Sequence, residues 1–178
     1  TLYDYETVLE QYYFKNAWTR QRKALDKKEK EIYTRDCGMK IDLLNLNWIY
    51  RAKKYYHMLP PDIYLMTIPI HYRIKVDEFK ALVEAPTVDQ FIQLLANTYY
   101  ENRFHAMQRS EGMEQFYKAC IHGMYLSDRR RNPYSLATVN TYLFLKEEEI
   151  NRLTTALECI RYGLTPRETL GYIGGAKK

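Results

Sequence analysis

Apolar residues recur at helical spacing along most of the chain, which predicts an all-α fold. The first stripe covers residues 4–34 and leaves room for a break near Asn16. We expect Cys37-Gly38 to interrupt this helix and a second one to run from residue 39 to Met58. Pro60-Pro61 should stop that helix, because proline lacks a backbone N–H and clashes with the preceding turn.

The segment "IYLMTIPIHYRIKV", residues 63–76, is the least helical part of the chain. It is rich in β-branched and aromatic residues, yet Pro69 argues against a central strand. We therefore predict a connector that contains a turn of helix or a short extended piece.

Further helical stripes are predicted at 76–85, 88–100, 101–126 and 136–162. Thr87 followed by Gln90 has the spacing of a capping box. Residues 127–135 carry a loop signal, with Asn132 or Ser135 as the cap of the next helix. Thr165-Pro166-Arg167-Glu168 combines a cap, a proline at the first helical position and a box glutamate, and it predicts a short last helix.

One asparagine lies on the apolar stripe of the helix at 39–58. In "IDLLNLNWIYRAK", Asn45 shares a helical face with apolar residues, Asp42 precedes it by three positions, and Arg51 and Lys53 follow. Buried polar groups cost free energy unless they are paired. We therefore interpret Asn45 as a residue that bonds the backbone of a neighbouring helix and fixes the register between helices. Arg51 and Lys53 are expected to pair with acids of the next helical unit or to face a partner.

A weak internal echo links residues 41–53 to "EEEINRLTTALEC", residues 147–159. Aligned in this way, Asn151 falls on Asn45 and Glu148 falls on Asp42, and the second copy ends near Arg161. These residues are candidates for equivalent structural or interface roles.

Composition narrows the class of protein only a little. A chain of 178 residues with 46% apolar residues and a net charge of +5 predicts one domain or two small ones. The mildly basic charge allows an acidic protein, an anionic lipid or a nucleic acid as partner. Cys37, Cys120 and Cys159 are far apart, which favours reduced thiols in a cytosolic compartment. No apolar run is long enough to span a bilayer.

Motifs for chemistry are absent from the sequence. It has no P-loop and no Gly-x-Gly-x-x-Gly, and its histidines lack metal-ligand spacing. We therefore predict no catalytic, cofactor-binding or metal-binding residues. The bases at 20–31 alternate with acids, a pattern that is typical of a solvated helix face. Because of Arg129-Arg130-Arg131, a helical adaptor or nucleic-acid-binding protein remains the alternative hypothesis for the function.

At "IDLLNLNWIYRAK" the chain resembles the C/d subunit of V-type and A-type rotary ATPases. Asp42, Asn45, Arg51 and Lys53 match that family's D-x-x-N-[LI]-x-x-I-x-R-x-K signature. The flanking segments "LYDYETVLEQYYFKNAW" and "YLFLKEEEINRLTTALECIRYGLTP" are also similar, in the family's order. The chain departs from the family at Ile70-His71-Tyr72, and Leu157 and Cys159 replace the bases in the second copy.

The resemblance implies a subunit without chemistry of its own. It would be part of a funnel of repeated multi-helix units, peripheral to the cytoplasmic face of the membrane, that links the central stalk to the membrane rotor ring. It would bind no nucleotide, cofactor, nucleic acid or small-molecule substrate. We expect one helical unit at 1–100 and a second at 101–178, together forming the C-terminal part of a longer chain.

Overall fold

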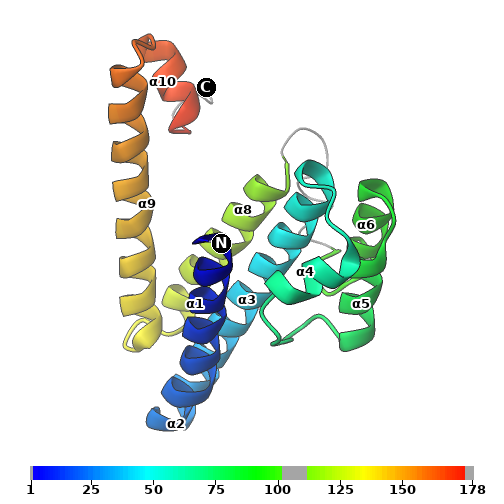
Figure 1. Cartoon of the computed structure of the whole chain (residues 1–178). Helices are drawn as coiled ribbons and strands as arrows, with labels where there is room; N and C mark the ends of the chain where they lie inside the picture. The colour runs from blue at the N-terminus through cyan, green and yellow to red at the C-terminus, as the bar shows by residue number, and fades with distance from the viewer. Residues whose placement is uncertain (1, 102–111, 175–178) are drawn as a thin grey trace.

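The computed structural model describes residues 2–101 and 112–174 and confirms the all-α fold (Figure 1). Within these ranges the chain forms helices joined by turns, and no strand occurs. The elements in chain order are α1 (Leu2–Asn16), η1 (Ala17–Gln21, a π-helical turn), α2 (Arg22–Ala24), α3 (Lys27–Tyr55), α4 (Pro60–Met66), α5 (Val76–Glu84), α6 (Val88–Leu95), α8 (Met113–Arg131), α9 (Leu136–Arg161) and α10 (Pro166–Tyr172). Part of the helix expected at 101–126 lies outside the described residues.

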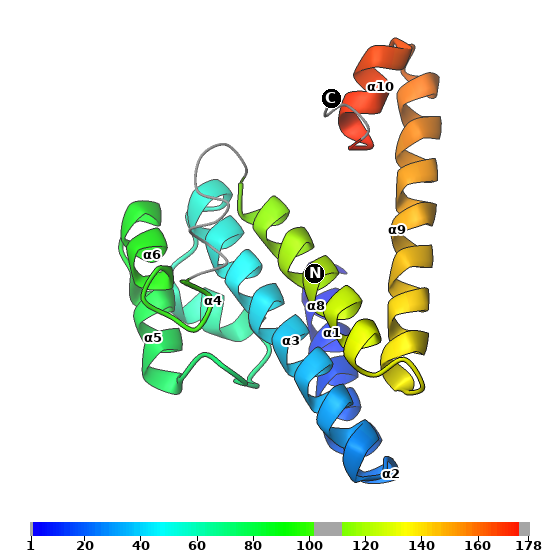
Figure 2. The ribbon, with the colours of Figure 1, turned by 180° about the vertical axis from the view of Figure 1, so that it is seen from behind.

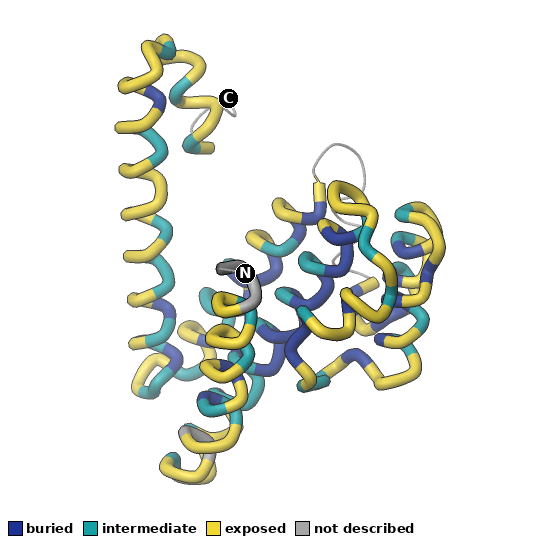
Figure 3. Tube along the Cα trace, viewed as in Figure 1, coloured by how far each residue is buried: buried dark blue, intermediate teal, exposed yellow. Residues whose placement is uncertain are grey.

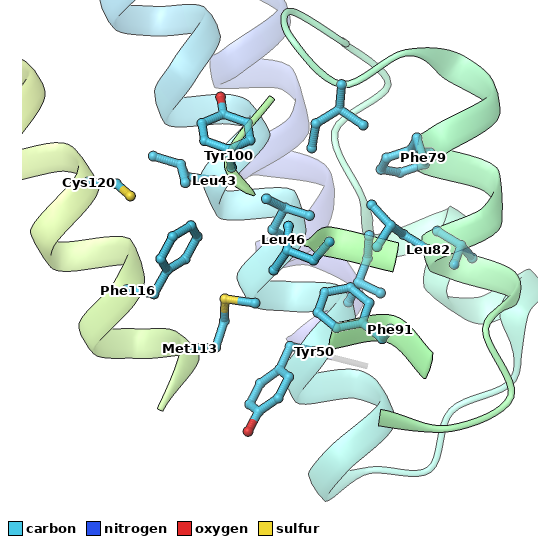
Figure 4. Close-up of a cluster of buried hydrophobic side chains, with 14 of the residues drawn as sticks. Leu43, Leu46, Tyr50, Phe79, Leu82, Phe91, Tyr100, Met113, Phe116 and Cys120 are labelled. Carbon is cyan, nitrogen blue, oxygen red and sulfur yellow. The ribbon is translucent and has the colours of Figure 1, made fainter. Parts of the chain in front are cut away.

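Helix α3 is the centre of the fold, with α8 on one side of it and α4 to α6 on the other (Figures 1 and 2). Its buried apolar side chains meet side chains from both neighbours in one core (Figure 4). The labelled members of this core are Leu43, Leu46, Tyr50, Phe79, Leu82, Phe91, Tyr100, Met113, Phe116 and Cys120. The core therefore includes residues from both sides of the unit boundary expected at residue 100, and the division into two units stays a prediction.

The expected interruption of the helix at Cys37-Gly38 is wrong. Helix α3 runs through both residues, and the break lies earlier, at Asp26, whose side chain accepts a hydrogen bond from the Glu29 N–H at 2.9 Å. Gly38 serves packing instead of ending a helix. A Cβ at this position would overlap Cγ of the Tyr72 ring, so only glycine lets this ring lie so close to the helix.

The other end of α3 also differs from the prediction. The helix ends at Tyr55, and His57, with φ of 48°, turns the chain before the prolines are reached. Pro60 then takes the first position of α4, where its missing N–H leaves no helical bond unmade. The prolines therefore begin a helix rather than stop one.

Several shorter predictions are confirmed. Helix α5 covers the expected segment, residues 67–75 form the expected irregular connector, and Thr87 caps α6 by accepting from the Gln90 N–H at 3.2 Å. Ser135 caps α9, and Thr165 with Glu168 forms the expected capping box of α10. The loop predicted at 127–135 is shorter than expected, because α8 continues to Arg131.

Helix α9 packs against the other helices at its N-terminal end, and its C-terminal end extends away from them (Figures 1 and 2). It contacts α3, α8 and α10, and its buried residues are Ala137 and Thr141 near the start and Cys159 near the end. The middle of the helix is largely exposed (Figure 3). Most of the large apolar side chains of α9 are therefore in contact with solvent.

The close approach of Tyr72 to α3 gives a first prediction. Replacing Gly38 by alanine should lower the free energy of unfolding by about 1–3 kcal/mol, because the Tyr72 ring must move away from the new methyl group. Gly123→Ala on α8 is the matched control, since a Cβ there meets no atom within 4 Å. It should stabilise the protein by up to about 1 kcal/mol through helix propensity. Urea denaturation of both variants measures the difference, and equal effects would contradict the packing role of Gly38.

Candidate functional site

Asp42 is a buried carboxylate on α3 that binds three consecutive backbone N–H groups. Its Oδ1 accepts from the Tyr72 N–H at 3.0 Å, and its Oδ2 accepts from the Arg73 and Ile74 N–H groups at 2.7 and 3.3 Å. The Tyr100 hydroxyl donates to Oδ2 at 3.1 Å. Burial raises the pKa of Asp42, and the three N–H groups and the Tyr100 hydroxyl oppose that rise because they stabilise the ionised form. The carboxylate thus fixes one end of the connector at 67–75 onto the helix.

Asn45 lies one helical turn further along and holds the other end of the same connector. Its amide nitrogen donates to the Ile68 carbonyl at 2.9 Å, and its amide oxygen accepts from the Ile68 N–H at 2.8 Å. Both polar groups of the Asn45 side chain are therefore paired with one residue. The sequence led us to expect a neighbouring helix as the partner, and the structure shows the irregular connector instead. The role of Asn45 in fixing the register stays a prediction.

Lys53 and Arg51 have different surroundings although both follow Asn45 on α3. The Lys53 ammonium donates to the carbonyls of Val83 and Ala85, each at 2.6 Å, and so binds the C-terminal end of α5. Burial lowers the pKa of Lys53. Arg51 is exposed and lines an open groove of about 560 Å³ between α1 and α3, together with Glu6 and Glu10.

The three candidates from the second copy are not brought together with the first set. Asn151 and Arg161 on α9 are exposed. Glu148 is partly buried and lies 3.7 Å from Arg152, one turn further along its own helix. The alignment of Asn151 with Asn45 therefore pairs an exposed residue with a buried one, so the two positions do not share surroundings.

A second group of buried polar residues was not singled out in the sequence. Asp36 on α3 and Asp128 on α8 are both buried. Arg35 donates from Nε to Oδ2 of Asp128 at 2.9 Å, and its Nη2 forms an ion pair with Oδ1 of Asp128 at 2.8 Å. Asn140 on α9 donates to Asp36 at 3.4 Å. One indirect signal was present in the sequence, since Asp36 and Asp42 interrupt the buried side of a single helix. It held no sign that Asp128 would lie beside Asp36.

The arrangement on α3 is suited to holding backbone in place. The polar atoms of Asp42, Asn45 and Lys53 are directed at peptide groups of the same chain, at hydrogen-bond distances. Among the described residues, no group of three or more side chains has the make-up of a metal site. Within the same residues, no helix is both long enough and apolar enough to cross a membrane. The fold and the site thus define an all-α protein in which buried polar side chains of one central helix anchor irregular segments.

Comparison with known families identifies this protein's class more closely. The model of the ATP synthase (C/AC39) subunit family matches residues 1–172. The chain therefore belongs to the ATP synthase (C/AC39) subunit family and is a subunit of a V/A-type rotary ATPase, as the resemblance of its α3 motif implied. Comparison with curated proteins and with solved structures gave no match.

Removing the Asn45 side-chain amide should destabilise the fold. Asn45→Leu leaves the buried Ile68 N–H without its acceptor and removes one of two donors to the Ile68 carbonyl, which still accepts from the Ile70 N–H at 2.8 Å. We therefore expect the free energy of unfolding to fall by about 1–3 kcal/mol. Asn151→Leu on the exposed face of α9 is the matched control and should change stability by less than about 0.5 kcal/mol. Full stability of Asn45→Leu in urea denaturation would disprove the anchoring role.

Asp42→Asn tests the carboxylate at the other end of the connector. An amide has one acceptor oxygen, so its NH₂ group must face at least one of the N–H donors that Asp42 now accepts from. We expect a loss of about 2–4 kcal/mol in the free energy of unfolding, against less than about 0.5 kcal/mol for Asp89→Asn at an exposed position. Thermal and urea unfolding measure both, and similar stability of the two variants would refute this account.

Proposed function

We propose that this protein is a non-catalytic coupling subunit of its rotary ATPase, linking the central stalk to the membrane rotor ring on the cytoplasmic face of the membrane. In this role it passes torque between the ATP-hydrolysing or ATP-synthesising head and the ion-carrying ring. Family membership over residues 1–172 is the observation that carries the proposal. The match of the family model to nearly the whole chain favours this role over the alternative, an unrelated helical adaptor or nucleic-acid-binding protein.

The anchoring of the connector supports a role in transmitting force. Asp42 and Asn45 tie residues 67–75 to α3, and Lys53 ties the end of α5 to the same helix. An irregular segment with paired backbone groups moves with the helix that holds it. The helices around α3 can therefore move as one body when a partner pushes on any of them.

The exposed apolar side chains of α9 support a role within an assembly. They recur at helical spacing along the helix, and each is more than half exposed. They are Val139, Tyr142, Leu143, Ile150, Leu153, Leu157 and Ile160. Contiguous exposed apolar surface of this kind is typical of protein–protein contacts. A subunit that joins two larger parts of a complex needs such a surface.

The test is a binding experiment with the separated parts of the enzyme. The tagged chain is mixed with purified central-stalk subunits and, separately, with the detergent-solubilised rotor ring, and binding is measured over a range of concentrations. The proposal expects saturable binding to both. A folded chain that binds neither part would overturn it.

A charged variant tests whether α9 takes part in this binding. Leu153→Glu combined with Leu157→Glu places two charges on the exposed stripe and should weaken binding to at least one part about tenfold or more, which corresponds to about 1.4 kcal/mol. Leu65→Glu is the control, because Leu65 lies on α4 and is exposed to a similar extent. Circular dichroism confirms that both variants stay folded. Equal affinities of the two variants would exclude α9 from the contact.

A further inference from the structure

The beginning of α9 is attached to the rest of the fold by three polar contacts. The Leu136 N–H donates to Glu29 of α3 at 2.8 Å. The Thr141 hydroxyl lies 2.9 Å from the Tyr125 carbonyl of α8 and shares its one proton between this carbonyl and that of Ala137 in its own helix, at 2.6 Å. The Asn140 amide donates to Asp36 of α3 at 3.4 Å. These contacts form the seat of α9, by which we mean the junction of residues 136–141 with α3 and α8.

Two buried carboxyl groups lie under this seat, and Arg35 is the arginine that contacts them among the described residues. The side chains of Asp36 and Asp128 are only 3% and 4% exposed. The Arg35 guanidinium contacts both carboxylate oxygens of Asp128, and its Nε lies 3.9 Å from Oδ1 of Asp36. One positive charge is therefore set against two groups that are negative when ionised. Asp36 Oδ1 is buried and receives no hydrogen bond from the described residues.

We propose that Asp36 and Asp128 share one proton, and that loss of this proton loosens the seat of α9 on α3 and α8. The proton occupies Asp36, because Arg35 already neutralises Asp128. A protonated Asp36 can donate to the adjacent Asp128 carboxylate, which gives the buried oxygen of Asp36 a partner. When the proton leaves, two buried negative charges face each other, and water can reach them only if the seat opens.

Electrostatics of the surrounding side chains agree with this assignment. Burial, followed by the adjacent Asp128, raises the pKa of Asp36 to about 8, while Asn140 and Arg35 act in the opposite direction. On α8 the Tyr125 phenol also faces the pair, and burial raises its pKa, so it stays neutral while Asp36 titrates. From α9 the facing group is the amide of Asn140, which carries no charge. The titration therefore belongs to the Asp36–Asp128 pair.

The sign of the pH dependence follows from the direction of this shift. An aspartate in the unfolded chain has a pKa near its ordinary value of 3.8, and in the folded protein the pKa of Asp36 is about 8. Between these values the folded state holds a proton that the unfolded state has lost. The stabilisation from this proton is complete below about pH 4 and declines until about pH 8. Above about pH 8 the folded pair is doubly charged and the seat is at its weakest.

Amide hydrogen exchange of the whole chain, followed by mass spectrometry, tests the proposal. Protection of residues 136–141, corrected for the intrinsic exchange rate, should fall by up to about tenfold for each pH unit between about pH 4 and 8 and stay at its lowest level above about pH 8. Asp36→Asn keeps a neutral donor at this position and should remove the pH dependence. Asp89→Asn is exposed and should retain it.

Two further measurements separate a proton switch from a merely structural role. Asp128→Asn leaves Arg35 free to bind Asp36, so the pH dependence should also disappear in this variant. In the wild-type protein, carboxyl ¹³C NMR should show one carboxyl group titrating between about pH 6 and 9. Flat protection of residues 136–141 across this range, or an unchanged slope in Asp36→Asn, would overturn the proposal. If neither aspartate variant folds, absence of that NMR titration decides against it.

Discussion

Residues 67–75 cross the buried side of α3 with neither a helix nor a strand to pair their peptide groups. Each N–H and carbonyl buried in this way needs a partner, because an unpaired one costs free energy comparable to a lost hydrogen bond. Helix α3 supplies the partners from two side chains one turn apart, Asp42 for residues 72–74 and Asn45 for Ile68. The rest of the fold depends on this pairing, since the connector joins α4 to α5 and so positions the core residues that α5 and α6 contribute.

The same physical solution recurs elsewhere in the chain. Lys53 binds the carbonyls at the end of α5, Glu29 binds the first N–H of α9, and Gln11 of α1 donates to the carbonyls of Leu65 and Thr67 at 2.6 and 3.0 Å. In each case a side chain on one helix completes the hydrogen bonding of a helix end or connector on another. Such hydrogen bonds fix the position of one helix or connector relative to another, whereas apolar packing alone lets neighbouring helices slide a little. This property fits the proposed role of the protein in transmitting torque.

The helices themselves could be predicted from the sequence, because periodicity and capping residues are local signals. Ser135, Thr87 and the Thr165–Glu168 box mark helix starts where the sequence placed them. The predictions failed where a residue's role is set by a distant neighbour. Gly38 was interpreted as a helix break because the sequence does not show that Tyr72 packs on it. Asp36 gave no clear signal, because its importance comes from Asp128, ninety-two positions away in the numbering.

The similarity between residues 41–53 and 147–159 shows that two segments with the same sequence pattern can have different structural roles. Asn45 and Asn151 each follow an acid by three residues on a long helix, but α3 is surrounded by other elements and α9 is covered mainly at its beginning and near its end. On α3 the polar side chains are buried and must bind backbone, so they determine the geometry of the fold. On α9 Asn151, which aligns with Asn45, is exposed, and Glu148, which aligns with Asp42, is only partly buried and faces Arg152 of its own helix. The polar residues that matter for α9 lie instead at its base, where Asn140 meets Asp36, and in our proposal the proton shared by Asp36 and Asp128 decides how firmly the helix is held.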